Sequence, residues 1–158
     1  MKYRRAFFPG SFDPFTKGHE AIVHKGITLF DEIIIGLGIH SNKTPYFDTE
    51  SRKAHISSLF IDLPVKVIDY SGLTIRACER YECSFILRGL RDTKDFQYER
   101  SIAQMNIEMA SIETVFLLTD LKNSAINATI VREIHQQGGD INQDVGVLLE
   151  HRLHPGAR

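Results

Sequence analysis

The sequence predicts an α/β protein in which helices cover both faces of a five-stranded, mostly parallel sheet. Two observations support this fold class. Short apolar runs alternate with segments of helical periodicity along the chain, and this alternation favours right-handed crossovers and parallel pairing. Runs such as Ile33-Ile34-Ile35 are apolar at every position, as expected for strands that are covered on both faces.

The apolar runs place the strands, and the periodic segments place the helices between them. The expected strands are residues 4–8, 32–39, 65–70, 85–87 and 114–118. The expected helices are residues 17–30, 49–60, 74–81, 96–110 and 128–137, with a short last helix at 144–153. The first strand should break at Pro9-Gly10, a turn dipeptide, because proline cannot donate to a strand ladder. This order predicts a Rossmann-like, doubly wound sheet.

Length and composition limit the class of protein. The 158 residues are expected to form a single domain, 1–158, with a tail at about 152–158. A formal net charge of −1 argues against extended nucleic acid as a partner. No apolar run approaches the ~20 residues that a membrane span needs. Cys78 and Cys83 form neither a zinc pattern nor a disulfide framework, so we expect a cytoplasmic protein that does not bind membranes.

The segment between the first expected strand and the first expected helix contains a candidate phosphate site. His19 falls in the first turn of that helix, where backbone N–H groups lack partners and the helix dipole is positive. A strand, a small-residue loop and a helix N-terminus together favour phosphate binding. A histidine placed there beside the hydroxyl of Ser11 indicates chemistry on the phosphate, although such a unit also occurs as plain scaffold.

Polar residues follow every expected strand, at the sheet edge where doubly wound proteins bind ligands. After the second strand comes Lys43, and after the fourth come Arg88 and Arg91. The arginines can offer forked donors to phosphate oxygens, and Gly89 between them lets the backbone approach a ligand. The pattern therefore favours an anionic ligand at this edge.

These motifs resemble those of the Thr/His-x-Gly-His nucleotidyltransferases, and among them the phosphopantetheine adenylyltransferase family. The run 9–14 (Pro-Gly-Ser-Phe-Asp-Pro) followed by 16–19 (Thr-x-Gly-His) is similar to the family signature. The run 88–91 (Arg-Gly-Leu-Arg) followed by 95–99 (Asp-Phe-x-Tyr-Glu) is similar to a second family motif. Thr16 favours the phosphopantetheine branch, because other members carry a histidine there. The resemblance extends from Arg5 to about Leu149.

A third segment, 123–132, resembles the family's Ile-Ser-Ser-Ser/Thr-x-x-Arg motif, which binds ATP phosphates at a helix N-terminus. Here Asn127 and Ala128 stand where the family usually has two serines, while Thr129 and Arg132 are retained. Asn127 can still cap the helix, but Ala128 offers only its backbone N–H. We expect this departure to weaken ATP binding or to slow turnover, by about 1–3 kcal/mol for the lost hydrogen bonds.

The resemblance implies an enzyme of coenzyme A biosynthesis that transfers AMP from MgATP to 4′-phosphopantetheine, giving dephospho-CoA and pyrophosphate. The attacking phosphate oxygen is already largely deprotonated at neutral pH, so in-line attack needs neither a general base nor a covalent intermediate. Mg²⁺ would be delivered with ATP. The resemblance also implies a homohexamer, with CoA as a candidate inhibitor.

The same resemblance implies roles for individual residues. The expected catalytic residues are His19, Lys43 and Arg91. The expected contacts to 4′-phosphopantetheine are Ser11, Lys43, Thr74, Arg88 and Asn106. The expected ATP contacts are Ser11, Phe12, His19, Gly89, Leu90, Arg91, Glu99, Asn123, Ser124, Ala125, Ile126, Asn127, Ala128 and Thr129. No residue is expected to be a dedicated metal ligand.

Two alternatives stay open. A nucleotidyltransferase with a different phosphate acceptor, such as nicotinamide mononucleotide or glycerol phosphate, would share the fold, although Thr16 and the 88–99 segment argue against it. A nucleotide- or CoA-binding family member with weakened catalysis is supported only by Asn127 and Ala128. Binding without turnover would distinguish this second alternative.

Overall fold

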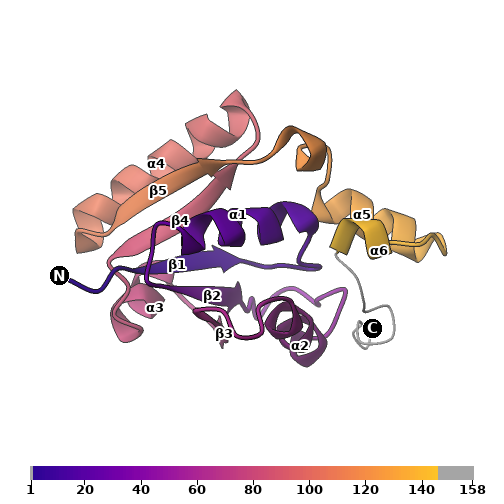
Figure 1. Cartoon of the computed structure of the whole chain (residues 1–158), viewed down its shortest axis with the longest axis horizontal. Coiled ribbons are helices and arrows are strands. Elements are labelled where there is room, and N and C mark those ends of the chain that lie inside the picture. The colour runs from indigo at the N-terminus through magenta and orange to yellow at the C-terminus, as the bar shows by residue number, and fades with distance from the viewer. Residues whose placement is uncertain (1, 146–158) are drawn as a thin grey trace.

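The sheet has the strand order β3-β2-β1-β4-β5, and all four pairings are parallel. It is seen in a computed structural model that describes residues 2–145. The strands are β1 (Arg5–Gly10), β2 (Glu32–Gly38), β3 (Val65–Tyr70), β4 (Phe85–Leu90) and β5 (Glu113–Leu118). The α/β, doubly wound fold expected from the sequence is confirmed, and Figure 1 shows the strands in this order.

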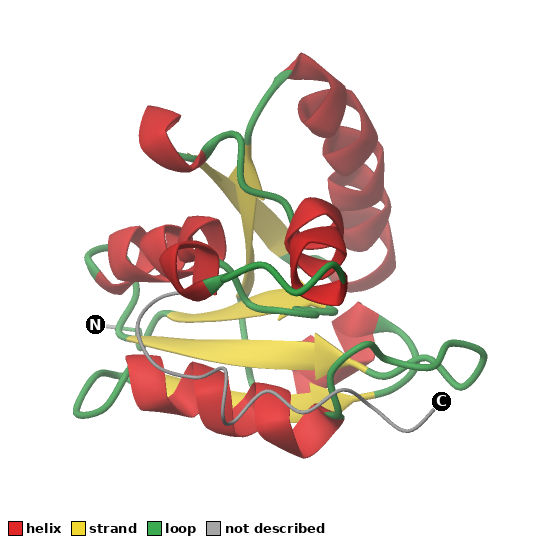
Figure 2. Cartoon of the chain, turned by 90° about the vertical axis from the view of Figure 1, so that its right-hand side faces the viewer, coloured by secondary structure: helices red, strands yellow, loops and turns green. Residues whose placement is uncertain are grey.

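Helices lie on both sides of the sheet (Figure 2). They are α1 (Lys17–Ile27), α2 (Thr49–Leu59), α3 (Thr74–Arg80), α4 (Thr93–Ala110), the 3₁₀ turn η1 (Leu121–Asn123), α5 (Ala128–Gln136) and α6 (Asn142–Val145). α4 begins before the expected Phe96 because the Asp92 side chain caps it, accepting from the Asp95 N–H at 2.9 Å. The part of the expected last helix beyond Val145 lies outside the described residues.

β1 does not break at Pro9-Gly10, so that expectation is wrong. Pro9 and Gly10 pair with Gly36 and Leu37 of β2. The Pro9 carbonyl faces β4, where it accepts from Arg88 Nη1 at 2.7 Å. Because the N–H and C=O of a strand residue point to the same side, the N–H that proline lacks falls on the β4 side. β4 pairs with β1 only at Ala6 and Phe7, so Pro9 disrupts no ladder bond there.

β4 is longer than the expected 85–87 strand and includes three residues that the sequence placed after it. Arg88, Gly89 and Leu90 pair in register with residues 116–118 of β5. Gly89 also allows close packing of α1, because a Cβ there would lie 2.9 Å from Ile22 Cγ1. Arg88 is therefore anchored by sheet pairing rather than carried by a loop.

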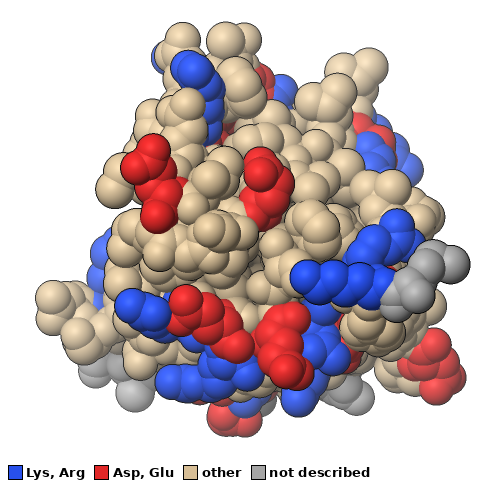
Figure 3. All heavy atoms as spheres, turned by 90° about the vertical axis from the view of Figure 1, so that its left-hand side faces the viewer, with Lys and Arg blue, Asp and Glu red and all other residues tan. Residues whose placement is uncertain are grey.

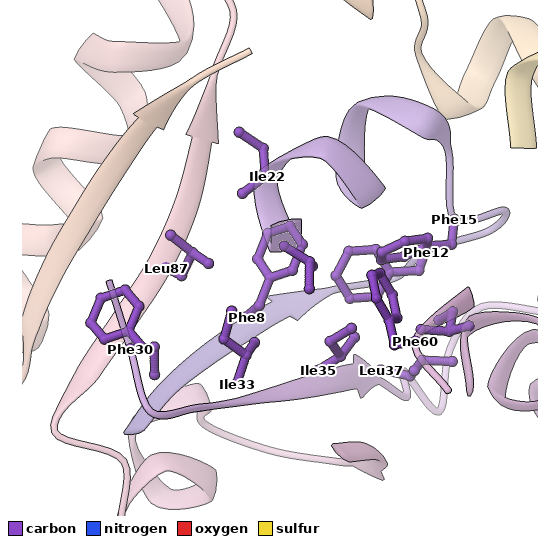
Figure 4. Packing of buried hydrophobic residues seen from close by; sticks show 13 residues of the cluster. Phe8, Phe12, Phe15, Ile22, Phe30, Ile33, Ile35, Leu37, Phe60 and Leu87 are labelled. Carbon is purple, nitrogen blue, oxygen red and sulfur yellow. The ribbon is translucent and has the colours of Figure 1, made fainter. Parts of the chain in front are cut away.

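Alternate residues of the central strands form two cores, one on each face of the sheet. On one face Phe8, Ile33, Ile35 and Leu37 pack with residues of α1 and α2. Figure 4 shows Phe12 and Phe15, from the loop after β1, within this cluster. The ring centroids of these two phenylalanines lie 5.1 Å apart. The opposite face has a second cluster, which includes Phe7, Ile34, Ile68, Ile75, Cys78 and Ile86.

The chain runs from β1 outward to β3 and then crosses to β4, so strand order reverses between β1 and β4. Ligands of doubly wound sheets bind beyond the strand ends at such a point. On the face that Figure 3 shows, basic and acidic side chains lie next to one another and do not form a patch of one sign. Among residues 2–145, none of the helices combines the length and hydropathy needed to cross a membrane.

Candidate active site

The loop after β1 leads directly into α1 through a reciprocal cap between Thr16 and His19. Thr16 is the N-cap, and its Oγ1 accepts from the His19 N–H at 3.5 Å. In return, the Thr16 N–H donates to His19 Nδ1 at 3.0 Å. Because Nδ1 is an acceptor in this bond, the neutral imidazole carries its proton on Nε2. The cap therefore fixes both the orientation and the tautomer of His19.

Aromatic rings and two arginines set the electrostatics of His19. The rings of Phe12 and Phe15 lie 5.0 and 5.3 Å from the imidazole, measured between centroids. Desolvation, with smaller contributions from Arg88 and Arg91, lowers the pKa of His19 to about 3. In the free protein at neutral pH, His19 is therefore a neutral hydrogen-bond donor close to two cations.

Arg88 is held in place before any ligand binds. Its Nη2 and Nε donate to the two carboxylate oxygens of Glu99, at 2.5 and 3.0 Å. Its Nη1 donates to the Pro9 carbonyl. Both side chains of the pair are largely buried, 30% exposed for Arg88 and 12% for Glu99. This bidentate geometry orients the guanidinium.

Arg91 follows β4 directly and is more exposed. Its Nε donates to Asp95 at 3.1 Å, and its backbone N–H reaches the same oxygen at 3.2 Å. Asp95 lies in the first turn of α4. With 41% of its side chain exposed, Arg91 can leave this surface pair for a phosphate at little cost.

The N-terminus of α5 forms another wall of the site. Asn127 is its N-cap and accepts from the Ile130 N–H at 2.9 Å. The carboxamide oxygen of Asn127 is thus used by the cap, while its NH₂ group remains a donor. Arg132 donates to Thr129 Oγ1 at 3.2 Å and to the Asp13 carbonyl at 2.8 Å, which ties α5 to the loop after β1.

These elements enclose a cavity of about 730 Å³, the β1–β4 cavity. Its lining includes most of the residues expected at the ATP site: Ser11, Phe12, His19, Gly89, Arg91, Glu99, Asn123, Ile126, Asn127, Ala128 and Thr129, together with Arg88. Asp13, Asp95, Thr119 and Arg132 also line it. A helix N-terminus, a histidine and three arginines line this cavity, and all of them can donate hydrogen bonds to the oxygens of a polyphosphate.

A second cavity of about 670 Å³, the α2–α5 cavity, adjoins the first and shares Ser11, Asp13 and Arg132 with it. The exposed Lys43 lines this second cavity. Five other expected site residues line neither cavity: Thr74, Leu90, Asn106, Ser124 and Ala125. Thr74 instead shares a 2.9 Å hydrogen bond with the Tyr70 hydroxyl. The roles expected for these five residues stay predictions.

Comparison with known proteins identifies the family. The sequence profile described as cytidylyltransferase-like matches residues 7–134. Phosphopantetheine adenylyltransferase from Bacteroides thetaiotaomicron is 47% identical over 141 residues, 89% of this chain and 93% of that protein. Phosphopantetheine adenylyltransferase from Flavobacterium psychrophilum is 49% identical over 138 residues, 87% of this chain and 91% of that protein. The chain belongs to the phosphopantetheine adenylyltransferase family.

Family membership confirms the resemblance seen in the motifs and makes this chain a nucleotidyltransferase. A solved structure of a bifunctional NMN adenylyltransferase/ADP ribose pyrophosphatase from Francisella tularensis superposes with a TM-score of 0.71. The superposition covers 90% of this chain and 45% of that one at 19% sequence identity. At such low identity, the likeness shows a shared fold alone.

Sequence reasoning missed two residues that organise the site, Asp13 and Arg52. The Asp13 carboxylate accepts from the backbone N–H groups of Tyr46 and Phe47, at 2.7 and 2.9 Å. The Arg52 side chain is buried and reaches the carbonyl of Ser11. The available signal was the spacing of Arg52 with His55 and Ile56, which puts a cation on the buried face of α2.

Proposed function

We propose that this protein transfers AMP from MgATP to 4′-phosphopantetheine, forming dephospho-CoA and pyrophosphate. The observation that carries the proposal is the convergence of His19, Arg88 and the α5 N-terminus on one cavity. Relatives named phosphopantetheine adenylyltransferase, at 47 and 49% identity over nearly their whole length, support the acceptor. The reaction is one step of coenzyme A biosynthesis.

In the proposed reaction, an oxygen of the acceptor phosphate attacks the α-phosphorus of ATP in line. A new P–O bond forms, the bond from the α-phosphorus to the α–β bridging oxygen breaks, and pyrophosphate leaves with the electron pair of that bond. The nucleophile carries its own negative charge, so no side chain has to remove a proton. The protein contributes orientation of the reactants and electrostatic stabilisation of the charge on the α-phosphate of the transferred adenylyl group.

His19 and each of three cations have a distinct part in this proposal. His19 donates from Nε2 to the ATP phosphates, since Nδ1 is engaged by Thr16. Arg91 exchanges its exposed partner Asp95 for an ATP phosphate. Arg88 keeps Glu99 as its orienting partner and faces the acceptor phosphate. Lys43, on the rim of the α2–α5 cavity, neutralises charge as the acceptor approaches.

We propose that Mg²⁺ enters as part of MgATP. The carboxylates that line the β1–β4 cavity already have partners, since Asp95 accepts from Arg91 and Glu99 accepts from Arg88. Within the described range 2–145, no group of three or more His, Cys, Asp or Glu side chains could hold a metal ion. The triphosphate oxygens are thus the natural ligands for a hard cation that retains several waters.

The proposal includes a homohexamer in the cytoplasm, with CoA as a competing ligand. Exposed apolar side chains on α4 support self-association: Phe96, Tyr98, Ile102, Met105, Ile107 and Met109 are 40–70% exposed. Four of them, Tyr98, Ile102, Met105 and Met109, share one face of α4 by their helical spacing, and an exposed apolar face of this kind is typical of surfaces that another chain covers. Sedimentation equilibrium at micromolar protein would measure the assembly, and a monomer would contradict this part of the proposal.

The decisive experiment is pyrophosphate release from MgATP with and without 4′-phosphopantetheine. We expect release that depends on the acceptor in the wild type and falls by at least about 100-fold in His19→Asn, as for loss of an oxyanion-type donor. Asparagine retains an acceptor for the Thr16 N–H and removes Nε2. His24→Asn is the matched control, because His24 lies on the same helix with its side chain 50% exposed.

The outcomes of this experiment distinguish the proposed function from its two alternatives. Release with nicotinamide mononucleotide or glycerol phosphate in place of 4′-phosphopantetheine would establish a different acceptor. Tight ATP or CoA binding without any release would contradict the enzyme assignment and favour a binding protein. Activity that survives His19→Asn would leave the function standing and overturn the role of His19.

A further inference from the structure

Arg52 of α2 is buried without taking part in the β1–β4 cavity. It is 3% exposed, and among residues 2–145 no other Lys, Arg, Asp or Glu is as deeply buried. Burying a guanidinium is unfavourable unless its hydrogen bonds repay the loss of water. Its Nη1 donates to the Ser11 carbonyl at 2.5 Å, and Nη2 donates to Thr49 Oγ1 at 3.2 Å. The shorter of these bonds is thus made to the backbone of the loop after β1.

The loop after β1 makes the reciprocal contact to the chain just before α2. The Asp13 carboxylate accepts from the N–H groups of Tyr46 and Phe47, at 2.7 and 2.9 Å. The two segments are therefore joined in both directions, by an arginine that reaches a loop carbonyl and by a loop carboxylate that reaches backbone N–H groups. These contacts make the position of the loop depend on α2.

The residue between these contacts has an unfavourable backbone conformation. Phe12 has φ of 47°, in the left-handed region that residues with a Cβ seldom adopt. The carbonyls on either side of it both accept from arginines, Ser11 from Arg52 and Asp13 from Arg132. Phe12 in turn packs its ring 5.0 Å from that of His19. The turn that presents Ser11 and His19 to the β1–β4 cavity is therefore held by two arginines, of which Arg132 lines that cavity and Arg52 does not.

We propose that Arg52 is a positioning residue that fixes the Ser11–Phe12 turn relative to the substrate phosphates. This inference rests on the proposed adenylyl transfer. Arg52 lines the adjoining α2–α5 cavity and not the β1–β4 cavity, so its effect on the reaction passes through the Ser11 carbonyl. A reacting group displaced by about 1 Å can slow a reaction by about 100-fold.

The geometry requires a guanidinium rather than any cation. The two Nη atoms bond Ser11 and Thr49 at the same time, and a planar fork fixes the angle between these bonds. A lysine ammonium on a flexible stem can reach the Ser11 carbonyl but imposes no such angle. Arg52→Lys should therefore retain the charge and recover only part of the positioning.

The kinetic test compares Arg52→Met and Arg52→Lys with the wild type at saturating MgATP and 4′-phosphopantetheine. We expect kcat to fall about 10- to 100-fold in Arg52→Met and less in Arg52→Lys, with each KM within about threefold of the wild type. Lys53→Met is the matched control, since Lys53 is the next residue of α2 and pairs with Asp69 at the surface. Its kcat should be unchanged.

A second test needs no turnover. Hydrogen exchange of residues 8–16, measured without substrates, should be faster in Arg52→Met than in the wild type and unchanged in Lys53→Met. If Arg52→Met does not fold, Arg52→Lys is used for the same comparison. Melting temperatures identify which variants are folded at the assay temperature.

Two results would overturn the proposal. One is a folded Arg52→Met with kcat within twofold of the wild type and unchanged exchange. The other is a tenfold rise in one KM at constant kcat, which would make Arg52 a ligand contact of the α2–α5 cavity. A wild type without acceptor-dependent release would reject the proposed function, while the exchange comparison would still decide whether Arg52 holds the turn.

Discussion

The Thr16 N–H donates to His19 Nδ1 at 3.0 Å, and this one bond decides which nitrogen of the imidazole is available to a ligand. The remaining nitrogen, Nε2, carries the proton of the neutral ring. Desolvation, and then Arg88 and Arg91, lower the pKa of His19 to about 3. The free protein therefore presents a neutral donor, and a bound triphosphate would change the balance of charge around it.

The first prediction is that MgATP binding takes up a fraction of a proton at His19. The anionic triphosphate offsets the charges of Arg88 and Arg91 that help to lower the pKa of His19, so binding raises that pKa. Uptake should therefore grow as pH falls from 8 to 6. Titration calorimetry in buffers of different ionisation enthalpy measures it, and the wild type minus His19→Asn isolates the share of His19. An identical uptake in both proteins would show that the imidazole stays neutral when ATP binds.

The second prediction concerns the Arg88–Glu99 pair. Arg88→Met leaves the carboxylate of Glu99, with its side chain 12% exposed, without its bidentate partner. It should therefore lower the free energy of unfolding more than the double change Arg88→Met/Glu99→Gln does. We expect a coupling of about 1–3 kcal/mol, less than for a fully buried pair because Arg88 is partly exposed.

Urea unfolding of the two single variants and the double variant measures this coupling. The exposed pair Arg76–Glu79, with side chains 68% and 46% exposed, provides the control cycle. It should give less than about 0.5 kcal/mol. Equal couplings for the two pairs would show that Glu99 does not orient Arg88.

The third prediction concerns the departure from the family motif at α5. Because Asn127 caps this helix through a 2.9 Å bond to the Ile130 N–H, Asn127→Ala should lower the free energy of unfolding by about 1 kcal/mol. Asn127→Ser should change it by less than half as much, since serine is also a good N-cap. Ala128→Ser, which adds a hydroxyl beside the β1–β4 cavity, should lower the KM for MgATP. An unchanged KM would mean that the backbone N–H of Ala128 already suffices.

The sequence was sufficient for the parts of the fold that depend on local pattern. Short apolar runs located all five strands, and the segment before His19 located the start of α1. The exact ends of β1 and β4 depend on pairing between strands that are far apart in the sequence, which the local pattern does not show. Pro9 stays in β1 because its missing N–H faces the side where β4 has already diverged. Arg88 lies within β4 because β5 extends alongside it.

In the candidate site, too, the sequence motifs predicted some of the residues, and tertiary packing revealed others. Residues from all three predicted motifs line the β1–β4 cavity, among them His19, Arg88, Arg91 and Asn127. This agrees with the expectation that polar residues near the strand ends lie close together. The spacing of Arg52 with His55 and Ile56 indicates a place on the buried face of α2, but an arginine on a helix is usually solvated, so that spacing does not predict the contact of Arg52 with the loop after β1. Its partner, the Ser11 carbonyl, is a backbone group that no residue pattern reveals.

The last prediction is a loss of stability on mild acidification caused by His55, which is fully buried in α2. His55 Nε2 bonds the Val145 carbonyl at 3.1 Å, and Nδ1 has no hydrogen-bond partner within the described part of the chain. Burial lowers the pKa of His55, opposed by the bond to Val145. Below the ordinary histidine pKa of about 6.5, the unfolded chain binds a proton that the folded protein does not. The free energy of unfolding should therefore fall as pH falls through that value.

His55→Gln separates this effect from other titrations, including that of His19, because glutamine can still donate to the Val145 carbonyl and does not titrate. The wild type should be more stable than His55→Gln at pH 7.5, and that difference should shrink by about 1 kcal/mol at pH 5.5. Urea unfolding at the two pH values measures it. A difference that stays constant with pH would show that His55 is protonated alike in the folded and unfolded states, and that the buried Nδ1 finds an acceptor when charged.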